Sequence, residues 1–209
     1  MMNLDYITLS RYLKIHDWAK KKNIDTTESF FPNQITAKLW MIEELFKLKI
    51  LTDSIKVEIV GSWYGWPLAE FLFKNFDIKS INMYDIDVDA CKVAHMYSRI
   101  FKVENKVKII NNNYWKVTNK SNSDLIINCS SEHMIETFDK FKHRYPLSPI
   151  FVVQSNNLIE EDTHINCCRN VDELIQKNKF KTIYYKGELD FNDLNENGKY
   201  KRFMVIGKI

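Results

Sequence analysis

Short apolar runs alternate with amphipathic stretches along most of this chain. The runs of strand length are residues 56–60, 80–84, 107–110, 124–129 and 149–154. The stretches between them with helical spacing of apolar positions are residues 67–76, 88–101 and 134–144. Strands that alternate with helices of this length form right-handed crossovers and a parallel sheet. The pattern therefore predicts an α/β domain with a Rossmann-like, mostly parallel sheet and helices on both faces.

The two ends of the chain depart from this alternation. Residues 180–189 and 199–208 have the pattern of two strands joined by a short polar loop, which predicts an antiparallel hairpin at the sheet edge and seven strands in all. The first part of the chain instead has helical patterns, and Pro32 stands where proline suits a first helical turn. We therefore expect an N-terminal helical extension at 1–53 and a Rossmann-like domain at 54–209.

Composition and charge narrow the class of protein only slightly. The chain has 209 residues, of which 45% are hydrophobic and 27% charged, as in ordinary soluble domains. Its net charge of +3 does not indicate a nucleic-acid partner, although it does not exclude one. We see neither a signal peptide nor an apolar run long enough to span a membrane, so we expect a cytoplasmic protein with no membrane partner. The four cysteines lack C-x-x-C spacing and are expected to be free thiols. The heavy use of Asn and Lys is typical of AT-rich genomes, viral ones among them.

A loop with two glycines follows the first strand, in the sequence V-E-I-V-G-S-W-Y-G-W-P. Gly61 stands at the carboxyl end of the strand, where open α/β sheets bind their ligands. Gly61 and Gly65 allow close approach of the backbone to a ligand or a positive φ, and Trp63 and Tyr64 are suited to stacking on a planar ring. The loop predicts a cofactor site. A plain strand-to-helix turn is the alternative, because the third glycine of the dinucleotide fingerprint is absent.

Two aspartates follow the second strand. Asp85 comes 24 positions after Gly61 (85 − 61), near the spacing at which an acidic residue accepts hydrogen bonds from ribose hydroxyls. Asp87 stands directly before the helix predicted at 88–101, where a carboxylate can cap the first turn. We count both aspartates among the candidate cofactor-binding residues, with capping as the alternative for Asp87.

These features, with the polar N-N-N turn after the third strand and the terminal hairpin, resemble the class I S-adenosylmethionine-dependent methyltransferases over about residues 54–209. The resemblance implies S-adenosylmethionine as cofactor. It places the loop G-S-W-Y-G, Ser62 included, against the methionine part, Asp85 at the ribose, and Asn112 and Asn113 near the adenine. The stretches G-S-W-Y-G-W-P-L and Y-D-I-D-V-D-A also resemble nicotianamine-synthase-type enzymes, which transfer the aminocarboxypropyl arm of the same cofactor.

The fourth strand leads into N-C-S-S-E-H-M, which contains the candidate catalytic residues. Family members that act on amino groups of bases or of glutamine often have [D/N]-P-P-[Y/F] here. Asn128 matches the first position, but no proline or aromatic residue follows, so that activity is not carried over. Glu132 and His133 are candidates for a general base or for orienting a substrate, and Ser130 and Ser131 are candidates for binding it. The alternative is that the serines cap the next helix and Glu132 lies in its first turn.

A polar segment, Q-S-N-N-L-I-E-E-D-T-H, begins at the carboxyl end of the fifth strand. Its candidate substrate-binding residues are Gln154, Asn156, Asn157, Glu160 and His164. Its acidic patch favours a substrate with an amine or cationic group, and an ordinary solvated loop is the alternative. The acidic and histidine spacing fits neither H-E-x-x-H nor an EF-hand loop, so no metal site is predicted.

The sequence as a whole predicts an S-adenosylmethionine-dependent transferase, most simply a methyltransferase. Its acceptor is polar and unidentified, either a small molecule or a macromolecule. Two alternatives stay open. One is aminocarboxypropyl transfer from the same cofactor. The other is a non-catalytic binding module that keeps the fold, which an exposed apolar face on the helix near 32–49 would favour.

Overall fold

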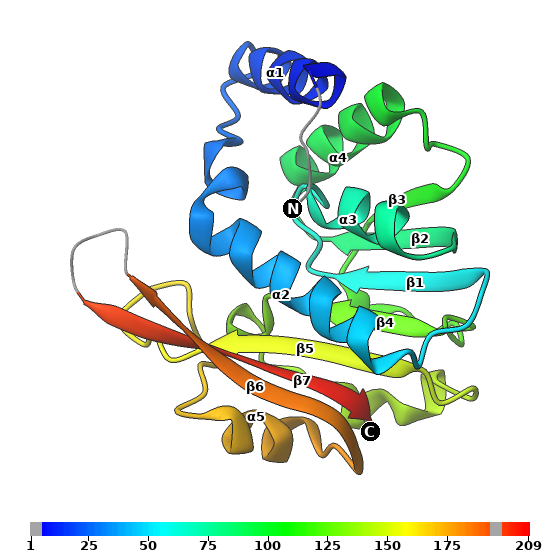
Figure 1. The fold of residues 1–209 in the computed structure, drawn as a ribbon, viewed down its shortest axis with the longest axis vertical. Coiled ribbons are helices and arrows are strands. Elements are labelled where there is room, and N and C mark those ends of the chain that lie inside the picture. The colour runs from blue at the N-terminus through cyan, green and yellow to red at the C-terminus, as the bar shows by residue number, and fades with distance from the viewer. Residues whose placement is uncertain (1–5, 193–197) are drawn as a thin grey trace.

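The computed structural model describes residues 6–192 and 198–209, and Figure 1 shows the arrangement of their helices and strands. The strands are β1 (Ile55–Val60), β2 (Ile78–Asp85), β3 (Val107–Asn111), β4 (Leu125–Asn128), β5 (Ile150–Asn156), β6 (Thr182–Asn192) and β7 (Lys199–Lys208). The α-helices are α1 (Tyr6–Lys20), α2 (Pro32–Leu48), α3 (Leu68–Asn75), α4 (Val88–Phe101) and α5 (Val171–Asn178). The 3₁₀ helices are η1 (Thr27–Phe30), η2 (Tyr114–Lys116), η3 (Ser131–His133) and η4 (Phe138–Arg144). Among these helices, none has the length and apolar character that a membrane span requires.

The strands form one seven-stranded sheet in the order β3-β2-β1-β4-β5-β7-β6. β1 to β5 pair in parallel, and β7 runs antiparallel to both β5 and β6. The predicted α/β fold, with a mostly parallel sheet and an antiparallel C-terminal hairpin, is confirmed. Part of the polar hairpin loop predicted at 191–198 lies outside the described residues, as do the first five residues of the predicted extension.

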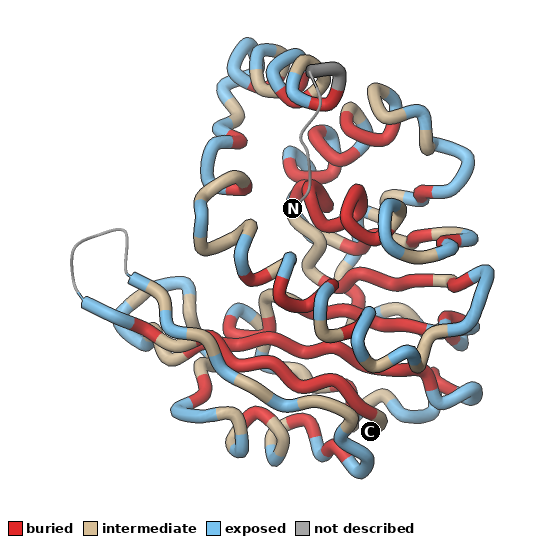
Figure 2. Tube along the Cα trace, viewed as in Figure 1, coloured by how far each residue is buried: buried red, intermediate tan, exposed pale blue. Residues whose placement is uncertain are grey.

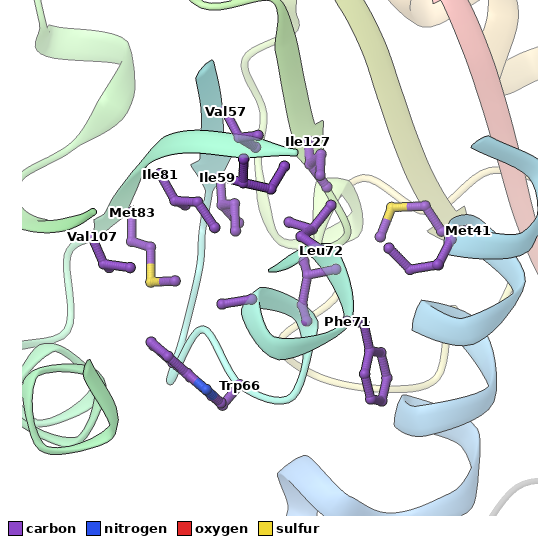
Figure 3. Packing of buried hydrophobic residues seen from close by; sticks show 14 of the residues in the cluster. Met41, Val57, Ile59, Trp66, Phe71, Leu72, Ile81, Met83, Val107 and Ile127 are labelled. Atoms are coloured by element: carbon purple, nitrogen blue, oxygen red, sulfur yellow. The ribbon is translucent and has the colours of Figure 1, made fainter. Parts of the chain in front are cut away.

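Both faces of the sheet are covered. Successive apolar side chains of a strand point to opposite faces, where they join two separate hydrophobic clusters. In β5, Val152 joins the cluster that packs under α1 to α4, whereas Phe151 and Val153 join the cluster under η4 and α5. The same alternation places Met204 and Phe203 of β7 in opposite clusters. Figure 2 shows the resulting buried centre of the sheet, and Figure 3 the packing of the first cluster around Leu72 and Phe71 of α3. Such two-sided burial explains why the central strands have continuous apolar runs.

The N-terminal helices pack on this same core. α2 packs against α3, β6 and β7, and α1 packs against α4. Met41 and Leu45 of α2 are buried in the first cluster. Leu39 and Phe46, which belong to the apolar stripe of this helix, are 38% and 61% exposed. The buried face of α2 therefore includes only part of the stripe, and the division of the chain at residue 53 stays a prediction.

Two helical predictions need correction. The segment predicted as a helix at 134–144 is a 3₁₀ helix from Phe138 only, with non-helical angles at Phe141. The i, i+3 spacing of Phe138, Phe141 and Arg144 suits three residues per turn, and both Phe138 and Arg144 are buried. The helix α5 was not predicted, because it is short and polar, although Asn170 caps it by accepting a hydrogen bond from the Glu173 amide.

Candidate functional site

A pocket of about 740 Å³ lies at the carboxyl ends of the parallel strands. Its lining includes Val60 at the end of β1, Gly61 directly after it, Asp85 at the end of β2 and Ser130 after β4. The strand order reverses between β1 and β4, and open α/β sheets bind ligands at such a point. The volume is in the range of pockets that hold a small molecule or cofactor.

The loop after β1 forms one wall of the pocket, and its backbone requires the two glycines. Gly61 has φ +60°, and a Cβ there would lie 2.3 Å from Met134 Cε. Gly65 has φ +73°, and a Cβ there would lie 2.4 Å from Met83 Sδ. Between them Trp63 also has a positive φ of 49°, lines the pocket, and stacks on Tyr64 with ring centroids 4.3 Å apart. The loop is therefore held in a strained turn, with its first glycine and Trp63 facing the pocket.

Ser62, Tyr64 and Gly65 are not among the lining residues. The Ser62 amide donates to the Tyr84 carbonyl (3.0 Å), and the Gly65 amide donates to the Ser62 carbonyl (2.7 Å). Tyr64 is buried, and its hydroxyl donates to the Asp25 carbonyl (2.7 Å). In this structure these three residues shape the loop, and their predicted contacts with a cofactor stay predictions.

Asp85 lines the same pocket as Gly61. Its carboxylate accepts hydrogen bonds from the backbone amides of Trp63 (2.6 Å) and Asp87 (2.9 Å). Burial raises the pKa of Asp85, and these amide hydrogen bonds oppose that rise because they favour the charged form. A carboxylate has about four acceptor sites, so two amide donors leave capacity for the hydroxyls of a ligand. Asp85 thus links the glycine loop to the pocket and can still accept from a diol.

Of the other candidate cofactor residues, some line the pocket and one does not. Asp87 is the N-cap of α4, accepting from the amides of Asp89 and Ala90, and does not line the pocket. Asn112 and Asn113 do line it. The Asn112 amide donates to the Asp85 carbonyl (3.0 Å), which places this turn beside the end of β2. The capping alternative for Asp87 is therefore the one that the structure shows.

The turn after β4 supplies the opposite side of the pocket. Ser130, Glu132 and His133 line it, whereas Asn128 and Ser131 do not. Asn128 is buried, and its side-chain oxygen accepts from the Ser130 amide (2.9 Å). The Ser131 hydroxyl donates to the Gln154 carbonyl (2.6 Å). Asn128 and Ser131 thus hold the turn, while their neighbours face the cavity.

Glu132 is only 2% exposed, and a buried carboxylate requires partners. Its Oε1 accepts from Asn156 Nδ2 (2.8 Å) and pairs with Arg202 Nη2 (3.4 Å). Arg202 also donates to the Cys129 carbonyl (3.1 Å). The second oxygen of Glu132, Oε2, is buried without any hydrogen-bond partner among the described residues. The site therefore contains one carboxylate oxygen that is oriented and unused.

The polar segment that begins at the carboxyl end of β5 contributes two of its five candidates. Asn156 and His164 line the pocket, and Gln154, Asn157 and Glu160 do not. Gln154 is fully buried on the α2 side, where its Nε2 donates to the Ala37 carbonyl (3.0 Å). Asn157 extends the pairing with β7 by accepting from the Lys201 amide (2.7 Å). Gln154 and Asn157 have structural contacts here, and a role in substrate binding for them and for Glu160 stays a prediction.

Much of the pocket wall comes from residues that the sequence interpretation did not single out. The N-terminal segment supplies Glu28, Phe31, Asn33 and Gln34. Other parts of the chain supply Tyr84, Trp115, Glu136, Glu161, Tyr200 and Arg202. No local pattern marks them, because long-range packing brings them together. Only Arg202 could have been identified from the sequence, because it is a charged residue at the start of the apolar run R-F-M-V-I-G.

Two half-buried groups at the pocket, Cys129 in its lining and Lys38 nearby, have shifted pKa values. Burial raises the pKa of the Cys129 thiol to about 11, so this residue is a neutral thiol and not a nucleophilic thiolate. Burial lowers the pKa of Lys38 to about 8, and the nearby charge of Arg202 lowers it further, while Cys129 and Glu132 oppose the change. The Lys38 ammonium donates to both the backbone and side-chain oxygens of Gln34.

Lys38→Met is expected to stabilise the protein near neutral pH. The folded-state pKa of about 8 lies below the ordinary value of 10.5, so folding disfavours the charged ammonium. Stability is reduced at pH values below the folded pKa and recovers as pH rises between the two values. We expect the variant to gain about 1–3 kcal/mol in free energy of unfolding at about pH 7, with the gain vanishing by about pH 10.5. Urea unfolding of both proteins across this range measures the difference, and a loss of stability or a pH-independent gain would contradict the prediction.

No protein-family model matches this chain, and no curated protein sequence matches it. Solved structures do resemble it. Geranyl diphosphate methyltransferase in complex with GPP and sinefungin has a TM-score of 0.60 at 10% identity, over 80% of this chain and 76% of that chain. Precorrin-6y C5,15-methyltransferase from Geobacter metallireducens has a TM-score of 0.56 at 10% identity, over 82% and 88% of the chains. TrmK of M. capricolum, in complex with S-adenosylhomocysteine, has a TM-score of 0.54 at 15% identity, over 79% and 66%. The chain therefore has the fold of the class I S-adenosylmethionine-dependent methyltransferases, the family that its sequence resembles.

Proposed function

We propose that this protein binds S-adenosylmethionine and transfers its methyl group to a polar acceptor in the pocket. The observation that carries the proposal is the convergence of Gly61 and Asp85 on one pocket at the point where the strand order reverses. Sinefungin and S-adenosylhomocysteine are bound by structures of the same fold. When bound, S-adenosylmethionine supplies an electrophilic methyl carbon on a sulfonium, so the protein has mainly to align the acceptor.

The residues divide between two halves of the pocket. Gly61, Trp63 and Asp85, with the Asn112 turn, would hold the adenosyl part and the methionine part. Ser130 and Asn156 on the other side would orient the acceptor. Glu132, His133 or His164 would remove its proton, since all three face the same cavity.

The charge of the lining fits a cationic cofactor and an uncharged or cationic acceptor. Its carboxylates are Glu28, Asp85, Glu132, Glu136 and Glu161, and Arg202 is its one Lys or Arg side chain among the described residues. Five negative groups against one positive group (1 − 5 = −4) attract a sulfonium and repel a polyanion such as a phosphate backbone. We propose a small or protein-borne amine or hydroxyl as the acceptor.

The direct test combines binding with product identity. Isothermal titration calorimetry should show saturable binding of S-adenosylhomocysteine and of sinefungin to the full chain, and absence of binding of either compound would sink the proposal. Incubation with labelled S-adenosylmethionine and a metabolite extract should then yield S-adenosylhomocysteine. Methylthioadenosine as coproduct would instead establish aminocarboxypropyl transfer, the alternative that rests on the resemblance of the loop to nicotianamine-synthase-type enzymes.

A non-catalytic binding module is the second candidate, and one observation favours it. Leu39 and Phe46 leave apolar surface exposed on α2, the helix that also carries Asn33 and Gln34 of the pocket wall. Cofactor binding without turnover, together with loss of a partner on replacing both exposed side chains by serine, would support this candidate over catalysis.

A further inference from the structure

We propose that Glu132, His133 and His164 form a binding site for a divalent first-row transition metal ion, of which zinc is the simplest case. One ligand atom from each of the three side chains lies within 4.8 Å of the others. No motif connects them, since His164 comes 31 positions after His133 (164 − 133) and belongs to the segment after β5. Folding brings them to one side of the pocket.

The hydrogen bonds of the two histidines engage Nδ1 and leave Nε2 free on each ring. His133 Nδ1 is 3.0 Å from the Thr163 carbonyl oxygen, and His164 Nδ1 is 2.7 Å from the Leu158 carbonyl oxygen. A carbonyl oxygen can only accept, so in the neutral rings Nδ1 carries the proton and Nε2 carries a lone pair. Metal-binding histidines are oriented by this kind of contact from the second ring nitrogen to a carbonyl. The two rings already face one another edge to face, with centroids 4.7 Å apart.

The carboxylate supplies the third ligand. Glu132 Oε1 is occupied by Asn156 and Arg202, which orient the group, whereas Oε2 is buried with no partner in the described part of the chain. A buried, unpartnered carboxylate oxygen is costly unless a cation or a donor binds it. An ion bound to Oε2 would remove that cost, and Glu136 and Glu161 in the same lining would help to balance its charge.

The geometry requires only a small closure. With metal–ligand bonds of about 2.1 Å, ligand atoms in a tetrahedral site lie about 3.4 Å apart, so a separation of up to 4.8 Å must shrink by at most about 1.4 Å. His133 is exposed on the short helix η3 and His164 is half-buried, so both rings have room for this movement. Two imidazoles and one carboxylate suit zinc, iron or cobalt, and three protein ligands leave coordination positions open to the pocket. An acceptor with a metal-binding oxygen or nitrogen fits those positions, and with an ion bound the three side chains would act as its ligands and no longer as proton acceptors. This last point rests on the proposed function, whereas the metal site does not.

The test measures metal binding alone, without cofactor or turnover. The full chain without an affinity tag is stripped with a chelator and titrated with Zn²⁺ by calorimetry, and with Co²⁺ by visible absorption. We expect one ion per chain and a cobalt spectrum without thiolate charge transfer. His133→Ala and His164→Ala should each weaken binding by more than about tenfold. The matched control is His143→Ala, because His143 is also an exposed histidine in a 3₁₀ helix but lies outside the pocket lining.

Each remaining outcome overturns the proposal. These outcomes are the absence of saturable binding, equal affinity in both histidine variants and wild type, or a thiolate band showing that Cys129 or Cys167 is the ligand. Both histidines are at or near the surface, so their loss should leave the fold intact, and circular dichroism checks this. A chain that fails to bind zinc can still bind S-adenosylhomocysteine, so this failure is distinct from failure of the proposed function.

Discussion

Asp85→Ala is expected to weaken binding of S-adenosylhomocysteine by about a hundredfold or more. A hydrogen bond to a charged group contributes about 1.5–3 kcal/mol, so loss of two ribose hydroxyl contacts costs about 3–6 kcal/mol. Each 1.4 kcal/mol corresponds to about a tenfold change in affinity. The variant also removes the acceptor of the Trp63 amide, and so loosens the glycine loop, which forms the pocket wall beside Asp85. Calorimetric titration of both proteins with S-adenosylhomocysteine measures the effect.

Asp89→Ala is the matched control for this prediction. Asp89 is an exposed carboxylate in the first turn of α4, paired with Lys92, and it does not line the pocket. Its replacement should leave the affinity within about twofold of wild type, since an exposed ion pair contributes less than about 1 kcal/mol. Asp85→Asn keeps the size of the side chain, and its affinity for S-adenosylhomocysteine should lie between those of Asp85→Ala and Asp89→Ala. Wild-type affinity in a folded Asp85→Ala protein would show that the ribose is held elsewhere.

The sheet could be predicted from the sequence because burial on both faces leaves a local signature. Strand segments such as L-I-I and I-F-V-V consist of consecutive apolar residues, and the polar turns between strands mark where each ends. The first half of the pocket was predictable for the same reason. Gly61 and Asp85 stand at strand ends, and parallel strands align those ends at one edge of the sheet.

The second half of the pocket could not be predicted in this way. Arg202 belongs to an antiparallel strand 70 positions after Glu132. It pairs with Asn156 of β5, which also contacts Glu132, and this long-range pairing brings the two side chains together. His164 lies in a segment without regular structure, where no period relates sequence spacing to position. The wall from the N-terminal segment depends on how α2 packs across the sheet. In each case a long-range contact, which no short window of sequence encodes, decides the neighbour.

Trp66→Ala is expected to lower the free energy of unfolding by about 3–5 kcal/mol, a large part of the stability of an ordinary domain. Trp66 (Figure 3) directly follows the glycine loop and is only 2% exposed. Its ring stacks on Tyr97 with centroids 5.2 Å apart and planes at 6°. Its removal leaves a cavity between α4 and the sheet. The neighbouring loop then loses its anchor, so cofactor affinity should fall together with stability. Urea unfolding followed by far-ultraviolet circular dichroism measures the loss without using tryptophan fluorescence.

Two further variants test whether the loss of stability in Trp66→Ala comes from lost packing or from the lost indole N–H. The Nε1–H group of Trp66 is buried without a partner in the described structure, so Trp66→Phe removes an unsatisfied donor while keeping a ring against Tyr97. An unsatisfied buried donor costs about 1–3 kcal/mol, so its removal offsets much of the stability lost through the smaller ring. We expect a net loss in free energy of unfolding below about 1.5 kcal/mol. Leu13→Ala, at a side chain that is 55% exposed on α1, should change stability by no more than about 0.5 kcal/mol. If Trp66→Phe destabilised the protein as much as Trp66→Ala, the indole N–H would have a partner that stabilises the loop, and packing alone would not explain why a tryptophan follows Gly65.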